Sequence, residues 1–112
     1  VYGDFLKDAS YILFCNKRPC GICLANINGT IANIPLVGIE KEHQGKGLSK
    51  HLVKRTTETI LNWAKSGERK ITELNVTSET NNIPALKMYR HAGFKEDYTY
   101  PQSYLPVSHF NR

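Results

Sequence analysis

Short apolar runs separated by turn-forming residues occupy the first third of the chain. Residues 10–15 read Ser-Tyr-Ile-Leu-Phe-Cys, and residues 20–27 form a second apolar run. Aromatic and β-branched residues favour strands, so both runs predict strands, joined by the turn residues 16–19. Asn28-Gly29 is a strong hairpin signal and leads into a third expected strand. The opening third is therefore predicted to be an antiparallel meander.

The third expected strand covers residues 30–40 and contains Pro35. Proline lacks the N–H group that a central strand needs, so it is confined to strand starts, edges and bulges. We therefore expect this strand to be ordered from about Ile34, with a bulge or a strand start at the proline.

The pattern changes to helical spacing after Gly47. The residues of one helix face recur every three or four positions as far as about Lys65, and Ser66-Gly67 provides the stop. The residues at this spacing are Leu48, His51, Leu52, Arg55, Thr56, Thr59, Ile60 and Trp63. The pattern predicts one long helix, with Trp63 in the core.

The last third returns to alternating strand and helix patterns. Residues 71–77 alternate as a strand does, and residues 84–91 predict a shorter helix that Asn82 caps and Ala92-Gly93 ends. Further strand candidates are residues 94–100 and residues 104–110. Hairpins come first and crossovers later, which predicts an α+β fold with a mixed, mostly antiparallel central sheet and helices on both faces.

Composition agrees with an ordinary globular domain. The chain has 112 residues, of which 40% are hydrophobic and 22% are charged, so a single domain over residues 1–112 is expected. The formal net charge of +5 favours polyanions. The charge does not single out nucleic acid, because the basic residues are dispersed and lack interleaved aromatics, and a phosphate-rich small molecule fits the charge equally well; no specific nucleic-acid binding is expected. The apolar runs are too short to span a bilayer, so no membrane association is expected.

The cysteines are Cys15, Cys20 and Cys23. An odd, low count argues against a disulfide framework and favours a reducing, cytoplasmic location. Cys20 and Cys23 have C-x-x-C spacing, but a zinc site needs further ligands and the sequence offers no second pair. On a regular strand, positions three apart point to opposite faces. We therefore expect these cysteines to act as small apolar filler, with no metal site.

The turn between the third strand and the long helix carries the first chemical signal. It contains Gln44-Gly45-Lys46-Gly47 just before the helix begins. A helix N-terminus exposes N–H groups with partial positive charge, and glycines allow an anion to approach the backbone closely. A strand, a glycine-rich turn and a helix together make a phosphate cradle. From the turn alone, glycine placed for steric reasons at a helix entry is an equally good interpretation.

The second signal is the segment of residues 82–94. It reads Asn-Ile-Pro-Ala-Leu-Lys-Met-Tyr-Arg-His-Ala-Gly-Phe and fits the pattern N-x-x-A-x-x-x-Y-x-x-x-G-F. Together with Glu42-x-x-Gly45-x-Gly47, it resembles the GNAT superfamily of N-acyltransferases, whose first motif is Q/R-x-x-G-x-G/A. The resemblance covers roughly residues 10–100. The departure at Glu42 concerns only a side-chain contribution, because in that family backbone amides hold the pyrophosphate.

The resemblance implies acetyl-CoA as co-substrate and assigns roles by position. The implied contact residues are Ile39, Glu40, Lys41, Gln44, Gly45, Lys46, Gly47, Leu48, Ser49, Asn82 and Tyr89. Residues 39–41 would offer backbone groups to the pantetheine arm in a gap between splayed strands, and residues 44–49 would cradle the pyrophosphate. Asn82 would bind the arm near its thiol end, and Tyr89 would protonate the departing thiolate. Taken singly, Asn82 is a helix cap and Tyr89 a packing aromatic.

Glu40 and Glu42 are general-base candidates by position, although exposed carboxylates at strand ends are common. The scattered histidines at positions 43, 51, 91 and 109 are expected to lie at the surface or pack in the core, and Phe94 is expected in the core. The family usually opens with a strand and helices, whereas here only residues 1–9 precede the first hairpin, with residues 2–7 a candidate helix remnant. A shortened family member or the carboxy-terminal part of a longer protein is expected.

The predicted function is transfer of an acetyl group from acetyl-CoA to a primary amine, by direct attack in a ternary complex without metal. Two alternatives stay open: a non-catalytic acyl-CoA-binding or regulatory module, and a basic nucleic-acid-binding module. The amine acceptor is not specified by the sequence, and neither is the oligomeric state, a homodimer included.

Overall fold

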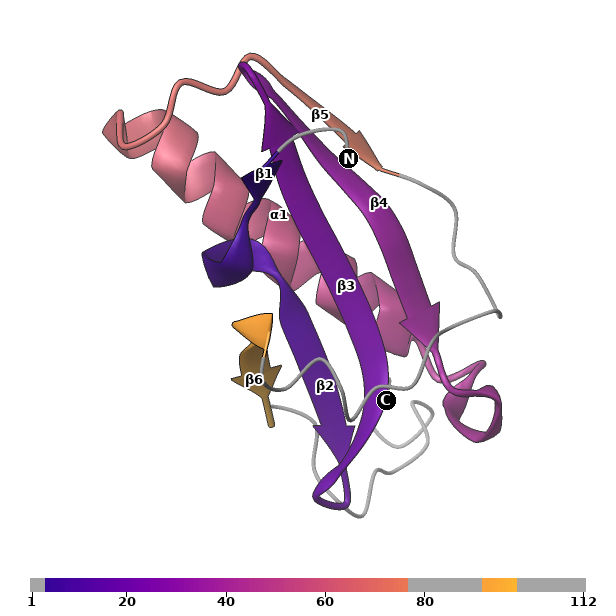
Figure 1. Ribbon diagram of the computed structural model, residues 1–112. Helices are drawn as coiled ribbons and strands as arrows, with labels where there is room; N and C mark the ends of the chain where they lie inside the picture. The colour runs from indigo at the N-terminus through magenta and orange to yellow at the C-terminus, as the bar shows by residue number, and fades with distance from the viewer. Residues whose placement is uncertain (1–3, 77–91, 99–112) are drawn as a thin grey trace, which may run out of the picture.

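The computed structural model describes residues 4–76 and 92–98. Six strands form one sheet in the order β5-β4-β3-β2-β6, with β1 also paired to β3 (Figure 1). The strands are β1 (Asp4–Phe5), β2 (Tyr11–Cys15), β3 (Arg18–Asn28), β4 (Ile31–Ile39), β5 (Glu73–Val76) and β6 (Lys95–Asp97). The described helices are η1 (Lys7–Ala9), η2 (Lys41–His43) and α1 (Leu48–Ser66).

The sheet confirms the predicted α+β class and is mixed. The pairs β1–β3, β2–β3 and β3–β4 are antiparallel, whereas β2–β6 and β4–β5 are parallel. The expected side-by-side arrangement of the third strand with residues 71–77 is confirmed by the β4–β5 pair. The description "mostly antiparallel" was too strong, because the two crossovers each add a parallel neighbour.

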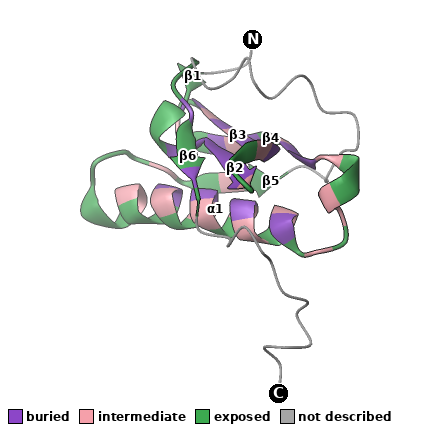
Figure 2. Ribbon diagram, turned by 90° about the horizontal axis from the view of Figure 1, so that it is seen from below, coloured by how far each residue is buried: buried purple, intermediate pink, exposed green. Residues whose placement is uncertain are grey.

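Helix α1 covers one face of the sheet, as Figure 2 shows by the buried residues on its sheet-facing side. Leu48, Leu52, Thr56 and Ile60 are its buried residues, each one turn from the next. The predicted helix is therefore confirmed to within a residue at its end, since Gly67 stops it with φ 83°. Trp63 is half-buried against the same core rather than fully inside it.

A second, smaller apolar cluster lies on the other face of the sheet. Ile12, Phe14, Ile22 and Phe94 form it. Phe94 is only 7% exposed and its ring centroid lies 5.1 Å from that of Phe5, so the expectation that Phe94 belongs to the core is confirmed. The helix predicted at residues 84–91 and the strand predicted at residues 104–110 lie outside the described residues.

Strand β4 differs from the expectation of a late start, because it is continuous from Ile31. Leu24 pairs with Leu36 and Asn26 with Asn33, so Ile34 and Pro35 together oppose one residue of β3. This is the bulge expected at the proline, and a bulge tolerates the missing N–H group. The first half of the strand is ordered because β3 and β5 flank it on both sides.

The amino-terminal segment also corrects an expectation. Asp4 and Phe5 are not part of a helix remnant, because they pair with Ile27 and Asn26 of β3, and Lys7 begins the short helix η1. The Leu6 N–H group donates to the Ala25 carbonyl at 2.9 Å, and the Leu6 side chain is buried. Burial of one leucine against the sheet therefore outweighs any local helical tendency.

The expectation that Cys20 and Cys23 point apart was wrong. Leu13 pairs with Gly21 and Phe14 with Pro19, so Cys20 is the extra residue of a bulge in the β2–β3 hairpin. A bulge shifts the alternation of side chains by one position, and Cys20 and Cys23 consequently join the same core cluster. Cys20 forms a disulfide with Cys15, which the low cysteine count had argued against, whereas Cys23 is buried as a thiol.

Among the described residues, no helix has both the length and the apolar character needed to cross a bilayer.

Candidate functional site

A tight turn carries the chain from the sheet into α1. Strand β4 ends at Ile39, and the Glu40 N–H group still donates to the Cys20 carbonyl of β3 at 2.8 Å. The chain then folds into η2, closed by hydrogen bonds from His43 N–H to Glu40 C=O at 2.8 Å and from Gln44 N–H to Lys41 C=O at 3.3 Å. Figure 1 shows this turn at the end of β4, directly before α1.

The two glycines of the turn adopt the left-handed conformation. Gly45 has φ 82° and Gly47 has φ 77°, a region that residues with a Cβ atom rarely adopt. A Cβ placed on either glycine would meet no atom of the described residues within 4 Å. The glycines are therefore required by backbone conformation, and no described residue crowds them.

The amino-terminal end of α1 adds an electrostatic contribution. Gly47 is its N-cap and provides no side-chain cap, and the first turn holds no acidic residue. The first N–H groups of a helix have no intrahelical acceptor and carry partial positive charge. Lys46 and Lys50 add full positive charges to this end. Residues 44–49, predicted together from the sequence, thus form a turn with the chemistry of an anion-binding site.

The edge of β4 next to this turn has no strand partner among the described residues. The β4–β5 pairing runs from Ile31–Glu73 to Ile34–Val76, where the described part of β5 reaches its last residue, and β4 extends to Ile39. Because Glu40 N–H bonds to β3, ladder alternation turns the backbone groups of Val37 and Ile39 away from β3. These groups therefore face the side of β4 on which β5 pairs with residues 31–34.

One of those edge groups already accepts a hydrogen bond. The side-chain amide of Gln44 donates from Nε2 to the Ile39 carbonyl at 2.9 Å. Gln44 and Ile39, both predicted site residues, are therefore in contact, and the Gln44 side chain bonds to the strand edge rather than to the turn.

Of the general-base candidates, Glu40 is half-buried and Glu42 is exposed. Lys41, a predicted contact residue, lies in η2 rather than on the strand.

A groove of about 410 Å³ follows the same edge between β4 and α1. Its lining consists of Val37, Ser49, Lys50, Val53, Lys54, Thr57 and Glu58. Two valines give it an apolar floor, and two lysines give it a basic rim. Its place beside the turn suits a ligand with an anionic end and a less polar arm.

The opposite face of the sheet carries a row of asparagines that the sequence analysis missed. Asn26 pairs with Asn33 across β3–β4, and Asn33 pairs with Asn75 across β4–β5. Asn75 Nδ2 donates to Asn33 Oδ1 at 3.2 Å, whereas the buried Oδ1 of Asn26 has no hydrogen-bond partner in the described part of the chain. With Asn28, Ile34, Pro35 and Val76 they line a pocket of about 370 Å³. Only the strand register reveals this row, because these residues lie far apart in sequence.

A second missed group ties the start of α1 to β6. Asp97 is buried, and its Oδ2 lies 2.8 Å from His51 Nε2 and 3.4 Å from Arg55 Nε. The sequence had predicted only a surface or core-packing position for His51. The ion pair anchors the amino-terminal half of α1, and hence the glycine turn, to the sheet.

Of the second sequence signal, residues 82–94, the structure describes residues 92–94. Asn82 and Tyr89 lie outside the described residues, so the structure does not place them. Gly93, which follows the predicted helix, has φ 102°, and Lys95 N–H donates to the Ser10 carbonyl at 2.8 Å where β6 begins.

The fold and the site together define a class of protein: an α+β domain in which a left-handed glycine turn joins the end of a sheet strand to the start of a long helix. A family model for the acetyltransferase (GNAT) domain matches residues 7–96. The chain therefore belongs to the GNAT acetyltransferase family, whose members in general transfer acyl groups to amines. No curated protein matches the chain.

Proposed function

We propose that this protein transfers an acetyl group from acetyl-CoA to a primary amine. One observation carries the proposal. The left-handed glycine turn at the start of α1, whose N-cap Gly47 provides no side-chain cap, lies directly beside the carboxyl end of β4, where the backbone groups of Val37 and Ile39 face away from β3. The turn suits a pyrophosphate, and the strand edge suits an extended chain that carries amide groups.

Each part of the co-substrate has a counterpart at this site. The backbone N–H groups of residues 44–49, with Lys46, would hold the pyrophosphate. The edge groups of Val37 and Ile39 would pair with the pantetheine arm, much as an added strand pairs with a sheet. The Gln44–Ile39 hydrogen bond supports this view, because it shows that the Ile39 carbonyl accepts from an amide N–H, the group that the arm carries.

The reaction needs no covalent enzyme intermediate. The neutral amine attacks the thioester carbonyl, so a C–N bond forms, the C–S bond breaks, and the thiolate leaves. A base removes the extra proton from nitrogen, and Glu40 and Glu42 are the candidates near the strand end. Tyr89 would return a proton to the thiolate. The roles of Tyr89 and Asn82 rest on their places in the family motif.

We assign the acceptor side to the asparagine pocket. Ile34 and Val76, the last paired residues that the structure describes in β4 and β5, both line that pocket. The side-chain amides of Asn33 and Asn75, which also line it and are not buried, would offer hydrogen bonds to the acceptor molecule. A neutral row of amides favours a polar, hydrogen-bonding acceptor over an anionic one.

The function is tested by measuring acetyl-CoA binding calorimetrically and CoA thiol release with a panel of primary amines. Saturable binding together with amine-dependent thiol release is expected. Binding without turnover on any amine would make the protein a non-catalytic acyl-CoA-binding module. The absence of binding at high excess of acetyl-CoA would remove the proposal altogether.

Tyr89→Phe tests the chemical step, because it removes the proposed proton donor and keeps the ring. We expect kcat to fall roughly ten- to a thousand-fold, as for loss of one general acid, with acetyl-CoA affinity little changed. The measurement is steady-state thiol release together with calorimetry on the same protein. A wild-type rate would reassign Tyr89 to packing, and a joint loss of affinity and rate would make it a binding residue.

A further inference from the structure

Two cysteines and one histidine meet outside the glycine turn. The Sγ atoms of Cys15 and Cys20 and one ring nitrogen of His43 all lie within 4.8 Å of one another. Cys20 is buried, and Cys15 and His43 are half-buried. In the structure the two sulfurs are joined as a disulfide. The cluster therefore gathers two soft sulfur donors and one imidazole at a site to which the acyl-transfer proposal assigns no role.

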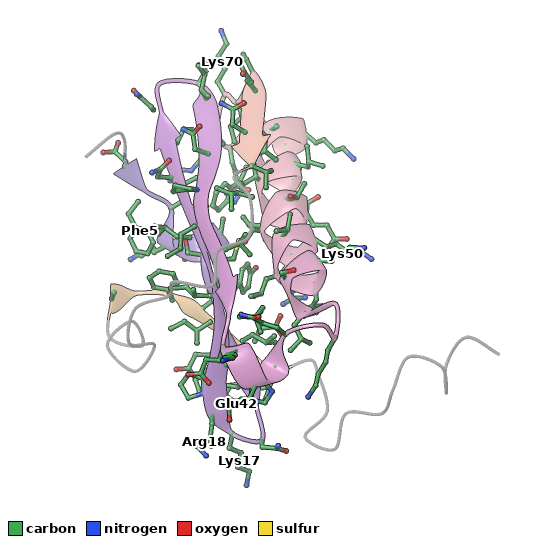
Figure 3. The ribbon with its side chains drawn as sticks, turned by 90° about the vertical axis from the view of Figure 1, so that its right-hand side faces the viewer. Phe5, Lys17, Arg18, Glu42, Lys50 and Lys70 are labelled. Carbon is green, nitrogen blue, oxygen red and sulfur yellow. A yellow bond between two sulfur atoms is a disulfide. The ribbon has the colours of Figure 1, made fainter. Side chains whose placement is uncertain are left out.

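The fold brings these residues together through two separate devices. The bulge at Cys20 turns its side chain to the α1 face, where Cys15 also packs. The hydrogen bond from Glu40 N–H to the Cys20 carbonyl then fixes the start of η2 beside that bulge, and η2 carries His43. Figure 3 shows the hairpin tip, marked by Lys17 and Arg18, at the same end of the molecule as Glu42 of η2.

The donor set matches the preferences of zinc. Thiolate sulfur and imidazole nitrogen are its usual protein ligands, at about 2.3 Å and 2.0–2.1 Å from the ion. Those bond lengths place one nitrogen and two sulfur ligands of a tetrahedron about 3.5–3.8 Å apart, so on reduction the two sulfurs would have to separate, to distances that stay within the 4.8 Å span of the present cluster. Three protein ligands leave the fourth position to water.

We propose that the reduced form of this protein binds Zn²⁺ through Cys15, Cys20 and His43. A thiol or phosphine reductant first supplies two electrons to the disulfide, which takes up two protons to give two thiols while the reductant is oxidised. Zinc then displaces both thiol protons and forms two Zn–S bonds and one Zn–N bond. The neutral dithiolate–zinc centre joins the β2–β3 hairpin to η2, and the disulfide is the metal-free, oxidised form of the same site.

Cobalt provides a direct optical test that needs no acetyl-CoA, so its result is independent of acyl transfer. The protein is reduced with a phosphine, freed of reductant without oxygen, and titrated with Co²⁺. We expect thiolate-to-cobalt charge-transfer bands and tetrahedral visible bands that saturate at one equivalent and disappear on adding Zn²⁺. The oxidised protein should show neither. Zn²⁺ should raise the Tm of the reduced protein, and a chelator should reverse this shift.

Variants separate this site from other metal-binding groups. Cys15→Ser and Cys20→Ser should each remove most of the charge-transfer intensity, and His43→Ala should weaken Co²⁺ binding by about tenfold or more through loss of one ligand. Cys23→Ala is the matched cysteine control and His51→Asn the histidine control, and both should keep the bands. If a variant does not fold, the reduced wild type is alkylated with and without zinc instead. Zinc should then protect the thiols of Cys15 and Cys20 from the alkylating reagent.

Several outcomes would overturn the proposal. Reduced wild-type protein without charge-transfer bands would show that the cluster binds no such ion. Bands that persist in the Cys15→Ser, Cys20→Ser double variant would place the metal elsewhere. Bands lost in Cys23→Ala but kept in His43→Ala would identify a different ligand set.

Discussion

The two ends of α1 are built on the same backbone conformation but differ in what surrounds them. Gly47 precedes the helix with φ 77°, and Gly67 follows it with φ 83°. Within the described part of the chain, neither glycine would have an atom within 4 Å of an added Cβ. Judged by conformation and local space alone, the two positions are equivalent.

Their surroundings differ in how the backbone groups are satisfied. At the carboxyl end, Gly67 N–H and Arg69 N–H both donate to the Trp63 carbonyl, at 3.1 and 3.4 Å. The Arg69 guanidinium also lies 5.1 Å from the Trp63 ring centroid, and Lys65 places a positive charge in the last turn. The amino end has no side-chain cap and no acidic residue in its first turn. Gly67 therefore closes the carboxyl end of the helix, whereas we propose that the turn at Gly47 receives an anion.

The first prediction concerns the contacts that anchor the amino-terminal half of α1 to the sheet. Asp97→Ala removes the buried carboxylate that contacts His51 and Arg55. We expect the free energy of unfolding to fall by about 1–3 kcal/mol, as for loss of hydrogen bonds to a charged group. Chemical denaturation measures this loss. A loss below about 1 kcal/mol would mean that packing, and not the ion pair, anchors this half of the helix.

The second prediction concerns the middle of α1, where the Cys23 thiol lies against Thr56. Burial raises the pKa of Cys23 from 9.0 to about 11, and the hydrogen bond with Thr56 partly opposes that shift. The folded protein thus holds this proton more tightly than the unfolded chain does. The stability linked to it is present below about pH 9 and is lost as the pH rises through about 11.

We expect the loss to be on the order of 2–3 kcal/mol, the free energy equivalent of a two-unit pKa shift. It is measured as the difference in unfolding free energy between wild type and Cys23→Ala from pH 8 to 11, with a phosphine present to prevent disulfide exchange. The variant lacks the thiol, so lysine and tyrosine titration cancels in the difference. A difference that does not change with pH would contradict the buried-thiol interpretation.

The third prediction tests the comparison between the two glycines directly. Gly47→Ala and Gly67→Ala should each cost about 1–2 kcal/mol of stability, because both force alanine into the left-handed region. Only Gly47→Ala should also weaken acetyl-CoA binding, by about tenfold or more, because its methyl group would enter the space above the turn. The acetyl-CoA affinities are measured by calorimetry at a temperature at which both variants are folded. Equal affinities for the two variants would refute the anion-binding role of the amino end.

The smallest expected effect concerns charge at the two ends. Lys50→Glu places a carboxylate in the first turn, which should raise the stability of the free protein by roughly 0.3–1 kcal/mol and weaken acetyl-CoA binding a few-fold. Lys65→Glu makes the same charge change in the last turn and should lower stability by a similar amount without affecting affinity. Thermal melts and calorimetry at low and high salt are the readouts. A Lys50→Glu protein with unchanged affinity at low salt would argue against an anion at this end.

The sequence by itself determined the elements whose signals are local. The period of α1 and its stop at Gly67, the Asn28-Gly29 hairpin and the glycine turn are all set by residues close together in the chain. The turn could be predicted down to residues 44–49, because left-handed glycines and a helix start require specific residue types at consecutive positions. The family motif added Asn82 and Tyr89, whose roles remain predictions.

Only the tertiary structure decided the features that depend on strand register. The Asn26–Asn33–Asn75 row, the His51–Asp97 contact and the Cys15–Cys20–His43 cluster join residues that no local pattern connects. The bulge at Cys20 reversed the expected orientation of its side chain, because one extra residue moves a strand's side chains to the other face. Local patterns fix which element a segment forms. Which residues meet depends on how the strands align, and that alignment is set by burial across the whole sheet.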